Sequence, residues 1–452
     1  MKNKKGLLLL GISLGYFMVL LDTTIVSVAL PSIQDELGGK LSTLEWITNA
    51  YTLVFASLLL TMGSLSDKLG GKQLYSIGLA LLGLSSVIMA ITSSISVLIS
   101  MRAVLGIGAA ALLPSSMTLF SHGFPVPSER ARAMGIWAGV TGAALAAGPV
   151  VGGFLVDTVG WRSIFMLNVP IALISFGLAR AFISETPRQS QKSIDLPGQL
   201  TAMAALGLFT FALIESQTLG WRSPWVLTTL CLALLAAALF IRIEIRASHP
   251  MLPLHLFHIR ALSAGMSAGI LINFGFSGIL FIMPLFFHHV WGYSASVTGL
   301  VFLPLTLPTV VGPIMAGRVV SRIGPKLPMT FGFIATSVGA FLLAAATFYP
   351  KGGVTMIIAM VLLGFGSAFT IPPLVTATLS ASPQGQTGIV SGALNTSRQL
   401  GAVLGVAILG AILHGNSSYS AGAQLNLAIT GVLLLGGSVL SYRYMGIQQK
   451  NN

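Results

Sequence analysis

Long apolar segments recur along the whole chain of 452 residues, and this pattern constrains the fold more than any other feature. Each segment approaches the length of about 20 residues that carries a helix across a bilayer. Only 8% of the residues are charged, whereas a soluble chain has about 25%. A transmembrane β-barrel is excluded, because its strands would appear as runs of about ten residues with alternating polarity. The sequence therefore predicts an all-α polytopic membrane protein.

Fourteen transmembrane helices account for the apolar segments. The first segment begins with basic residues, like a signal peptide, but its apolar run continues to residue 30 and no cleavage signal closes it. We therefore expect it to be the first transmembrane helix. The helices are expected near residues 8–30, 43–65, 73–93, 96–119, 131–156, 161–184, 196–216, 223–243, 262–287, 296–318, 327–347, 353–375, 387–413 and 424–444.

The basic residues lie mainly in alternate loops, which is the positive-inside pattern of membrane proteins. The loops expected outside the cell hold only Lys40, Arg162, Arg222 and Lys351. This asymmetry places both termini in the cytoplasm. The formal net charge is +13, but these charges do not gather on one face or tail, so we expect no nucleic-acid binding. The single cysteine, Cys231, lies in an apolar run and is expected to be a small buried residue.

Two hydrophilic connectors divide the chain. One covers residues 185–199, and the other covers residues 242–260 and is expected to form a short surface helix. They bracket the seventh and eighth helices. We therefore predict a six-helix bundle at residues 1–190, an inserted helix pair at 191–245 and a second six-helix bundle at 246–452.

One loop sequence occurs twice. The segment MGSLSDKLGGK at residues 62–72 aligns with MAGRVVSRIGPK at 315–326, so that Gly70 corresponds to Gly324. A second, weaker match at a similar offset pairs residues 144–153 with 401–410. Two matches in the same order indicate a duplicated six-helix unit. Such repeats, with a substrate path at their interface, are typical of secondary transporters.

An acidic residue, Asp22, lies near the middle of the first apolar segment. An acid inside the membrane is energetically expensive and by default indicates a functional site. It can take up a proton on one side and release it on the other as its surroundings change. The structural alternative is an Asp22 that only hydrogen-bonds neighbours such as Thr23 or Thr24. Two other acids, Asp157 and Glu215, lie near outer helix ends, where a solvated role is the simpler interpretation.

The motifs around these residues resemble those of the major facilitator superfamily, and within it the fourteen-helix drug:proton antiporter family. The resemblance covers nearly the whole chain and implies two six-helix bundles, an inserted helix pair and proton-coupled export. Its segments are LDTTIVSVALPSI (21–33), GSLSDKLGGK (63–72), RAVLGIGAAALLPSS (102–116), GIWAGVTGAALAAGPVVGGFL (135–155), WRSIFMLNVPI (161–171) and SGALNTSRQLGAVLG (391–405).

The resemblance implies that Asp22 and Arg102 couple transport to protons. Arg102 opens the fourth-helix motif, where it would pair with Asp22 or tune its affinity for a proton. The alternative is an arginine whose side chain extends to the membrane surface. Leu105 stands where the family often has glutamine, so a polar neighbour is missing from this motif.

The loop between the second and third helices is implied to be a cytoplasmic gate that steadies the outward-facing state. Its glycines permit a tight turn, and a carboxylate is favoured near the start of a helix. Gly71 departs from the family pattern, which usually has arginine there. The alternative is a turn that only fixes topology. The candidate gate residues are Gly63, Asp67, Lys68, Gly70 and Lys72, with Arg322, Gly324 and Lys326 in the second half.

The fifth helix resembles a motif typical of antiporters. Small residues at these spacings let helices pack backbone to backbone, and a proline bends the helix. The motif therefore predicts a face on which the helix pivots and seals, although an ordinary packing face is the alternative. The matching residues are Gly135, Gly148, Pro149, Gly152 and Gly153, and Ala144 replaces one glycine.

A few polar and aromatic residues within the helices are candidates for a substrate cavity. Each of them also suits a purely structural contact between helices. The candidates are Trp46, Asn49, Tyr51, Asn273, Asn395, Arg398 and Gln399.

We therefore expect a proton-coupled antiporter that exports hydrophobic drugs or toxic small molecules, cations included, by alternating access. One alternative is a dedicated exporter of one metabolite or self-made antibiotic. A membrane-embedded enzyme or receptor is a third hypothesis, but the chain has no HExxH or GxxxxGK[ST] motif. We expect no enzymatic activity, no cofactor and no metal site. We expect a monomer in the lipid bilayer of a bacterial plasma membrane.

Overall fold

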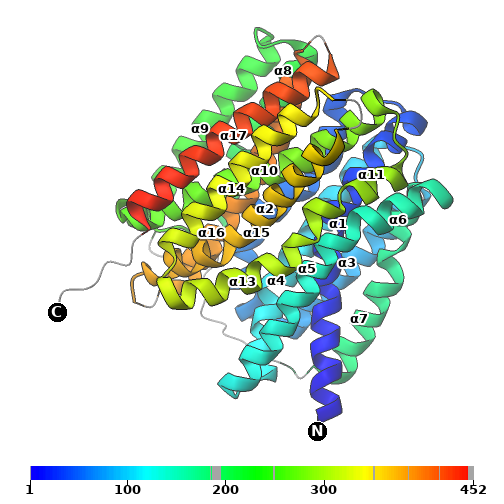
Figure 1. Ribbon diagram of the computed structural model, residues 1–452. Coiled ribbons are helices and arrows are strands. Elements are labelled where there is room, and N and C mark those ends of the chain that lie inside the picture. The colour runs from blue at the N-terminus through cyan, green and yellow to red at the C-terminus, as the bar shows by residue number, and fades with distance from the viewer. Residues whose placement is uncertain are drawn as a thin grey trace. The chain divides into compact units, whose positions relative to one another are not determined.

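The computed structural model describes residues 2–183, 185, 195–247, 250–349, 352–384, 386–416 and 418–445. Every regular element in these residues is a helix, as Figure 1 shows. Fourteen helical spans in this part of the chain are long and apolar enough to cross a membrane. The predicted all-α polytopic fold is confirmed. Most of the linker expected at residues 185–199 lies outside the described residues.

Most of the helices extend beyond the apolar segments that predicted them. Inside a bilayer every backbone N–H and C=O must find its partner within the helix, so an apolar segment tends to become helical. The first span runs over Lys2–Leu37 rather than 8–30, because its helix continues past the apolar residues at both ends. The second connector forms the expected short helix, a 3₁₀ turn η1 at Leu254–His258.

Two spans that the sequence predicted as single helices are interrupted. The sixth consists of α6 (Arg162–Met166) and α7 (Asn168–Phe182), and the tenth consists of α11 (Ala295–Val301), α12 (Leu303–Thr306) and α13 (Pro308–Ile323). Proline supplies no backbone N–H and its ring crowds the preceding turn. Pro304 and Pro308 stand in the first turns of α12 and α13, which explains why the helix breaks there.

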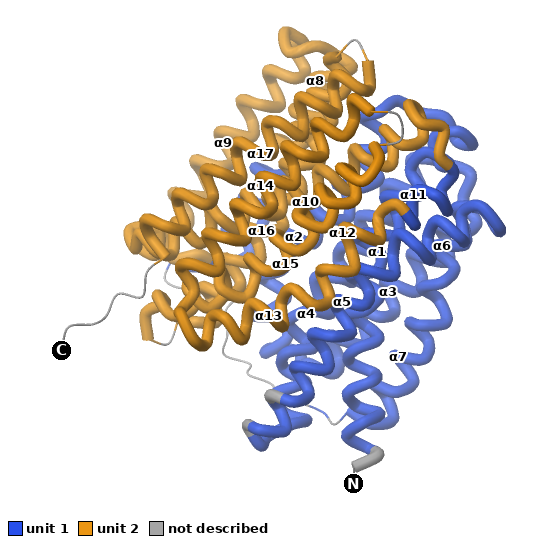
Figure 2. The backbone as a smooth tube through the Cα atoms, viewed as in Figure 1, with its two compact units in different colours: residues 1–206, 247–251, 294–300 blue, residues 207–246, 252–293, 301–452 orange. Residues whose placement is uncertain are grey.

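The chain forms two compact units, coloured separately in Figure 2. Unit 1 comprises residues 1–206, 247–251 and 294–300. Within it α1 packs against α5 and α7, α4 packs against α2 and α3, and α3 packs against α7. Besides α6 and α7, its helices are α1 (Lys2–Leu37), α2 (Leu41–Leu69), α3 (Gly71–Ile91), α4 (Ile95–Gly123), α5 (Pro127–Thr158) and the start of α8 (Leu196–Leu219).

Unit 2 comprises residues 207–246, 252–293 and 301–452. Within it α10 packs against α16 and α17, α15 packs against α13 and α14, and α14 packs against α17. Its further helices are α9 (Pro224–Arg246), α10 (Arg260–Trp291), α14 (Lys326–Ala346), α15 (Gly353–Ser380), α16 (Thr387–His414) and α17 (Tyr419–Tyr444).

The helix pairings of unit 1 return in unit 2, which confirms the predicted duplication. The α1–α5 contact corresponds to α10–α16, the α2–α4 contact to α13–α15, and the α3–α4 contact to α14–α15. The aligned loops also share their backbone geometry. Gly70 has a φ of +93° and Gly324 has a φ of +77°, a region that is open to glycine but strained for other residues.

The inserted helices α8 and α9 are the least buried spans. In their most apolar stretches 28% and 11% of the residues are buried, against 72% in α10. The exposed Cys231 lies on α9, so its predicted burial is wrong, because α9 packs against few other helices. The start of α8 is fixed within unit 1, where Gln199 Nε2 donates to the Ser57 carbonyl of α2 over 2.8 Å.

Candidate functional site

Asp22 and Arg102 form an ion pair inside unit 1. Both side chains are buried, with exposed fractions of 0% and 2%. Arg102 Nη1 donates to Asp22 Oδ2, and Arg102 Nε donates to the Ile47 carbonyl over 2.8 Å. The guanidinium also lies over the ring of Tyr51, 4.7 Å from its centroid. A single arginine therefore connects a carboxylate, a carbonyl and an aromatic ring.

Three helices hold this pair in place. Asp22 lies on α1, Tyr51 on α2 and Arg102 on α4. The Tyr51 hydroxyl donates to the Val19 carbonyl over 3.1 Å, which ties α2 to α1. A Cβ at Gly106 would lie 2.6 Å from the Tyr51 carbonyl oxygen, so the glycine allows α4 to approach α2 closely. The predicted pairing of Asp22 with Arg102 thus follows from close helix packing.

The structural alternatives for the two residues do not fit this geometry. Thr23 and Thr24 donate to the Leu20 and Leu21 carbonyls of their own helix, and neither bonds to Asp22. Arg102 is buried, so its side chain does not extend to the membrane surface.

Three buried polar atoms in this part of unit 1 have no hydrogen-bond partner among the described residues. They are Asp22 Oδ1 and the amide oxygen and nitrogen of Asn49, a fully buried residue of α2. Buried polar groups without partners are rare and each requires an explanation. A carboxylate oxygen without a hydrogen-bond partner is open to a proton. This suits a proton-transfer role for Asp22.

Sequence reasoning missed Glu45, an acid that is fully buried in the first turns of α2. It precedes Asn49 by four residues, so the two share one face of the helix. The sequence contained a signal, because an acid stands between the apolar residues Leu44 and Ile47 near a helix start. An acid at that depth also suits the membrane surface, and only packing shows that it is buried.

The fifth-helix motif uses its glycines for two contacts. Gly148 and Gly152 face α1, where a Cβ on either would overlap Thr24 or Ile25. Gly153 faces the backbone of Ala295, on the segment 294–300 that belongs to unit 1. Gly135 has no heavy atom within 4 Å of its Cβ position, so this residue of the motif makes no close contact.

The other candidate acids have structural partners. The carboxylate of Asp157 accepts hydrogen bonds from the backbone N–H groups of Ala295 and Ser296 over 3.1 and 2.8 Å. It therefore caps the start of α11, where a negative charge is favourable. Glu215 Oε2 accepts a hydrogen bond from Thr218 over 2.9 Å. Neither acid joins the Asp22–Arg102 pair.

The predicted gate residues lie at helix ends in each unit. In unit 1, Lys72 Nζ donates to the Arg180 carbonyl over 3.3 Å and lies 3.9 Å from the Glu185 carboxylate, while Lys68 is exposed. Gly63 and Asp67 are half-buried near the end of α2. In unit 2, Lys326 Nζ lies over the Tyr442 ring, 4.2 Å from its centroid, and Arg322 is exposed.

The predicted cavity residues fall into two groups. Asn49 and Tyr51 belong to the buried site in unit 1, and Trp46 lies half-buried on the same helix. Asn273, Asn395 and Arg398 meet in unit 2. Arg398 Nε donates to Asn273 Oδ1 over 3.4 Å, and Arg398 Nη1 donates to Asn395 Oδ1 over 3.5 Å. Gln399 is half-buried beside them in the chain.

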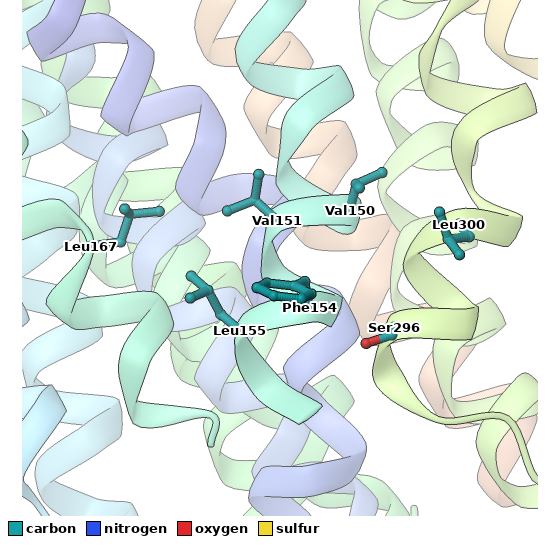
Figure 3. A pocket seen from close by; sticks show the side chains of 7 residues that line it. All are labelled: Val150, Val151, Phe154, Leu155, Leu167, Ser296 and Leu300. Atoms are coloured by element: carbon teal, nitrogen blue, oxygen red, sulfur yellow. The ribbon is translucent and has the colours of Figure 1, made fainter. Parts of the chain in front are cut away.

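An apolar recess of about 390 Å³ opens beside the fifth-helix motif, and none of the predicted cavity residues lines it. Figure 3 shows Val150 of α5 and Leu300 of α11 reaching toward each other across it, with Phe154 on α5 nearby. Phe154 and Leu300 are 62% and 56% exposed, so the recess is a shallow surface feature. We assign it to the packing of α5 against α11. Its remaining walls are Val151, Leu155, Leu167 and Ser296.

A sequence profile described as Major Facilitator Superfamily matches residues 12–406. The chain belongs to this superfamily. Its members are transporters rather than enzymes, and they bind small-molecule substrates within the membrane. The fourteen spans and the bacterial relatives together make the chain a multi-pass plasma-membrane protein.

Similar proteins with curated names are drug-resistance and efflux proteins. The chain is 36% identical to the methylenomycin A resistance protein of Bacillus subtilis (strain 168), covering 90% of this chain and 87% of that protein. It is 33% identical to the multidrug resistance protein Stp of Mycobacterium tuberculosis (strain CDC 1551 / Oshkosh), covering 91% and 76%. It is 34% identical to the tetracenomycin C resistance and export protein of Streptomyces glaucescens, covering 90% and 75%.

Solved structures of transporters share the fold. A D-xylose–proton symporter superposes with a TM-score of 0.72 at 16% identity and covers 97% of both chains. The nucleoside transporter NupG superposes with a TM-score of 0.69 at 12% identity, covering 97% of this chain and all of that one. At this level of identity the likeness concerns the fold alone.

Proposed function

We propose that the protein is a proton-coupled antiporter that exports hydrophobic drugs or toxic small molecules by alternating access. The observation that carries the proposal is the buried Asp22–Arg102 pair, a titratable acid held inside the membrane by three helices. The names of its relatives support drug export, since they describe multidrug resistance and antibiotic export.

Proton binding at Asp22 changes the charge of the site. With Asp22 ionised, the pair is neutral overall and Arg102 is held by a charge-assisted hydrogen bond. When Asp22 takes up a proton, the ion pair is lost and Arg102 keeps the Ile47 carbonyl and the Tyr51 ring as partners. These two states differ in how firmly α1 is held to α4. A proton can therefore bias the equilibrium between inward-facing and outward-facing conformations.

We assign the gate and the pivot to the two loops and to the fifth helix. The loop at residues 63–72 and its counterpart at 322–326 form the cytoplasmic gate, and the Gly148–Gly153 face is the pivot. The close approach of Gly148 and Gly152 to α1 supports a joint that depends on small residues. The positive-inside pattern supports cytoplasmic termini. We propose a monomer with six-helix bundles at 1–190 and 246–452, and an inserted helix pair at 191–245 between them in the sequence.

A dedicated exporter of a single antibiotic is the second candidate function. It is favoured by the names of two relatives, which specify methylenomycin A and tetracenomycin C. Both functions use the same proton site, and they differ only in the breadth of the substrates.

Proton-coupled export is tested with purified protein in liposomes that contain a pH-sensitive dye. We expect some hydrophobic drugs, added one at a time, to drive proton movement through the native protein. Asp22→Asn should abolish drug-driven proton movement and leave only drug exchange, because an amide cannot carry the proton. Asp157→Asn is the matched control. It also removes a carboxylate from a helix, but one that caps α11, so proton coupling should persist.

Drug transport by the native protein without proton flux would refute the antiport mechanism. Coupling that survives in Asp22→Asn would place the proton site on another acid, with the buried Glu45 the first to test. Transport of one compound alone from a broad panel would favour the dedicated exporter.

A further inference from the structure

The two ends of the inserted helix pair meet at one turn of α2. Gln199 lies in the first turn of α8, and Met251 follows the end of α9. Thr61 Oγ1 donates to Gln199 Oε1 and lies 3.7 Å from Met251 Sδ. Gln199 Nε2 donates to the Ser57 carbonyl over 2.8 Å. All four residues belong to unit 1, and we call them the α2 clamp.

The α2 clamp uses both polar atoms of a buried amide. Gln199 is 3% exposed, and its amide oxygen and nitrogen both have partners on α2. Ser57 and Thr61 stand four residues apart, so they lie on one face of that helix. Burying an amide is costly unless it is hydrogen-bonded. Sliding α8 along α2 would leave these polar atoms unpaired, so the clamp fixes the position of α8 on α2.

The start of α8 holds Gln199 in this position. The Asp195 side chain caps the helix, since its Oδ1 accepts a hydrogen bond from the Gly198 backbone N–H over 2.8 Å. The Gln199 backbone N–H donates to the Asp195 carbonyl over 2.9 Å. The Gln199 side chain therefore projects from a capped helix end, where its backbone is fixed.

The part of α2 beyond the clamp is loosely packed. Among residues 60–69, all of which the structure describes, only Ser66 is buried, and its Oγ lies 3.1 Å from Thr118 Oγ1 on α4. This segment leads into the proposed gate, whose first residue, Gly63, follows Thr61 by two positions. A contact at Thr61 therefore affects how firmly the gate end of α2 is held.

Apolar contacts alone would not fix the inserted helices at one position. In its most apolar stretch only 11% of α9 is buried. Lipid tails are as apolar as the side chains of such a helix, so hydrophobic contact gives no preference for one position along α2. The hydrogen bonds of Gln199 supply that preference, because they have direction.

We propose that the inserted helix pair is a brace for the cytoplasmic gate, fixed to α2 by Gln199 and Thr61. The start of α8 and the segment after α9 then move together with α2 throughout the transport cycle. The inference rests on the proposed export function, because it gives the inserted helices a part in gating. Gln199 and Thr61 are positioning residues, since they act on the gate through α2.

The connection between α2 and α8 is measured as the distance between two spin labels in purified protein. The labels replace Lys40, at the start of α2, and Leu200, beside Gln199, after Cys231→Ser has removed the native thiol. Both labelled positions are exposed. About twenty residues of α2 separate Lys40 from the clamp, so a rise of about 1.5 Å per residue places the labels about 30 Å apart. We expect one narrow distance peak, at the same position in the native protein and in Asp22→Asn.

Variants of the clamp test its role in gating. Gln199→Leu removes both hydrogen bonds of the amide. It should broaden the distance peak and slow drug-driven proton flux about tenfold, the factor that corresponds to one lost buried hydrogen bond. Thr61→Val should have a weaker effect of the same kind, because Gln199 keeps the Ser57 carbonyl, and Thr61→Ser should behave like the native protein. Thr201→Val is the matched control on α8. It removes a hydroxyl that donates to the Pro197 carbonyl of its own helix over 2.7 Å, so peak and flux should not change.

Two separated distance peaks in the native protein would overturn the proposal, because the clamp would then open during the cycle. It is also overturned if Gln199→Leu and Thr61→Val leave both the peak and the flux as in the native protein. The distance needs neither a drug nor a proton gradient. Failed proton coupling in the native protein would therefore refute the export mechanism and leave the distance result standing.

Discussion

At the scale of single residues, two opposing energies act on the Asp22–Arg102 pair, and transport can use the balance between them. Burying two charges in the membrane is costly, and their mutual attraction offsets that cost only while both are present. The pair also has few other partners, namely the Ile47 carbonyl and the Tyr51 ring on the arginine side. Changing the charge of either residue therefore affects the stability of the whole α1–α2–α4 contact.

This predicts non-additive stabilities for variants of the pair. Arg102→Ala leaves a buried carboxylate without its partner and should destabilise the protein by about 3–5 kcal/mol. The double variant Asp22→Ala/Arg102→Ala should be more stable than Arg102→Ala, since the unpaired charge is gone. Thermal unfolding of the purified variants in detergent measures this. Effects that simply add would show that the two side chains do not interact.

At the scale of helices, glycine decides which faces meet. Gly148 and Gly152 let α5 touch α1, and Gly401 and Gly405 do the same for α16 on α10. In a bilayer, helices gain little from hydrophobic burial against each other, so close backbone packing carries much of their association. The aligned segments 144–153 and 401–410 thus pack in the same way in both units, each through glycines against the first helix of its bundle.

We expect Gly148→Ala to push α5 away from α1, because its Cβ would lie 2.9 Å from Thr24 Cβ and 3.1 Å from the Ile25 nitrogen. Overpacking of this kind costs about 1–3 kcal/mol. Gly135→Ala is the matched control on the same helix. Its Cβ meets nothing within 4 Å, so it should stabilise the helix by about 0.5–1 kcal/mol.

Thermal unfolding and drug-driven proton flux, measured on both variants, test this. Gly148→Ala should lower both quantities, and Gly135→Ala should lower neither. Equal behaviour of the two variants would mean that the Gly148 contact contributes nothing to stability or to the pivot.

At the scale of the whole molecule, charge sets the orientation in the membrane. Fourteen spans and an excess of basic residues in alternate loops predict that both ends of the chain lie in the cytoplasm. A green fluorescent protein fused after residue 452 should therefore fluoresce, because it folds in the cytoplasm and not after export. Alkaline phosphatase inserted at Gly220, in the loop between α8 and α9, should be active because that loop is predicted outside. The opposite result for both fusions would show that the topology is inverted.

The sequence by itself determined the spans, the duplication and the intramembrane acid. Span length and apolar composition are local properties, and a bilayer forces any such segment into a helix. The aligned loops revealed the duplication because Gly70 and Gly324 occupy corresponding backbone turns. Asp22 stood out because a carboxylate in an apolar segment is rare. Breaks at Pro304 and Pro308 were harder to foresee, since proline is also tolerated within membrane helices.

Only the tertiary structure decided which polar groups meet. Sequence spacing allowed Arg102 to pair with Asp22 or to reach the membrane surface, and the close approach of α4 to α2 at Gly106 selected the pair. The burial of Glu45, the cap that Asp157 provides for α11 and the Asn273–Arg398 contact depend on helix faces that are far apart in the chain. Local pattern fixes each helix, whereas packing between helices fixes the charge environment in which each residue acts.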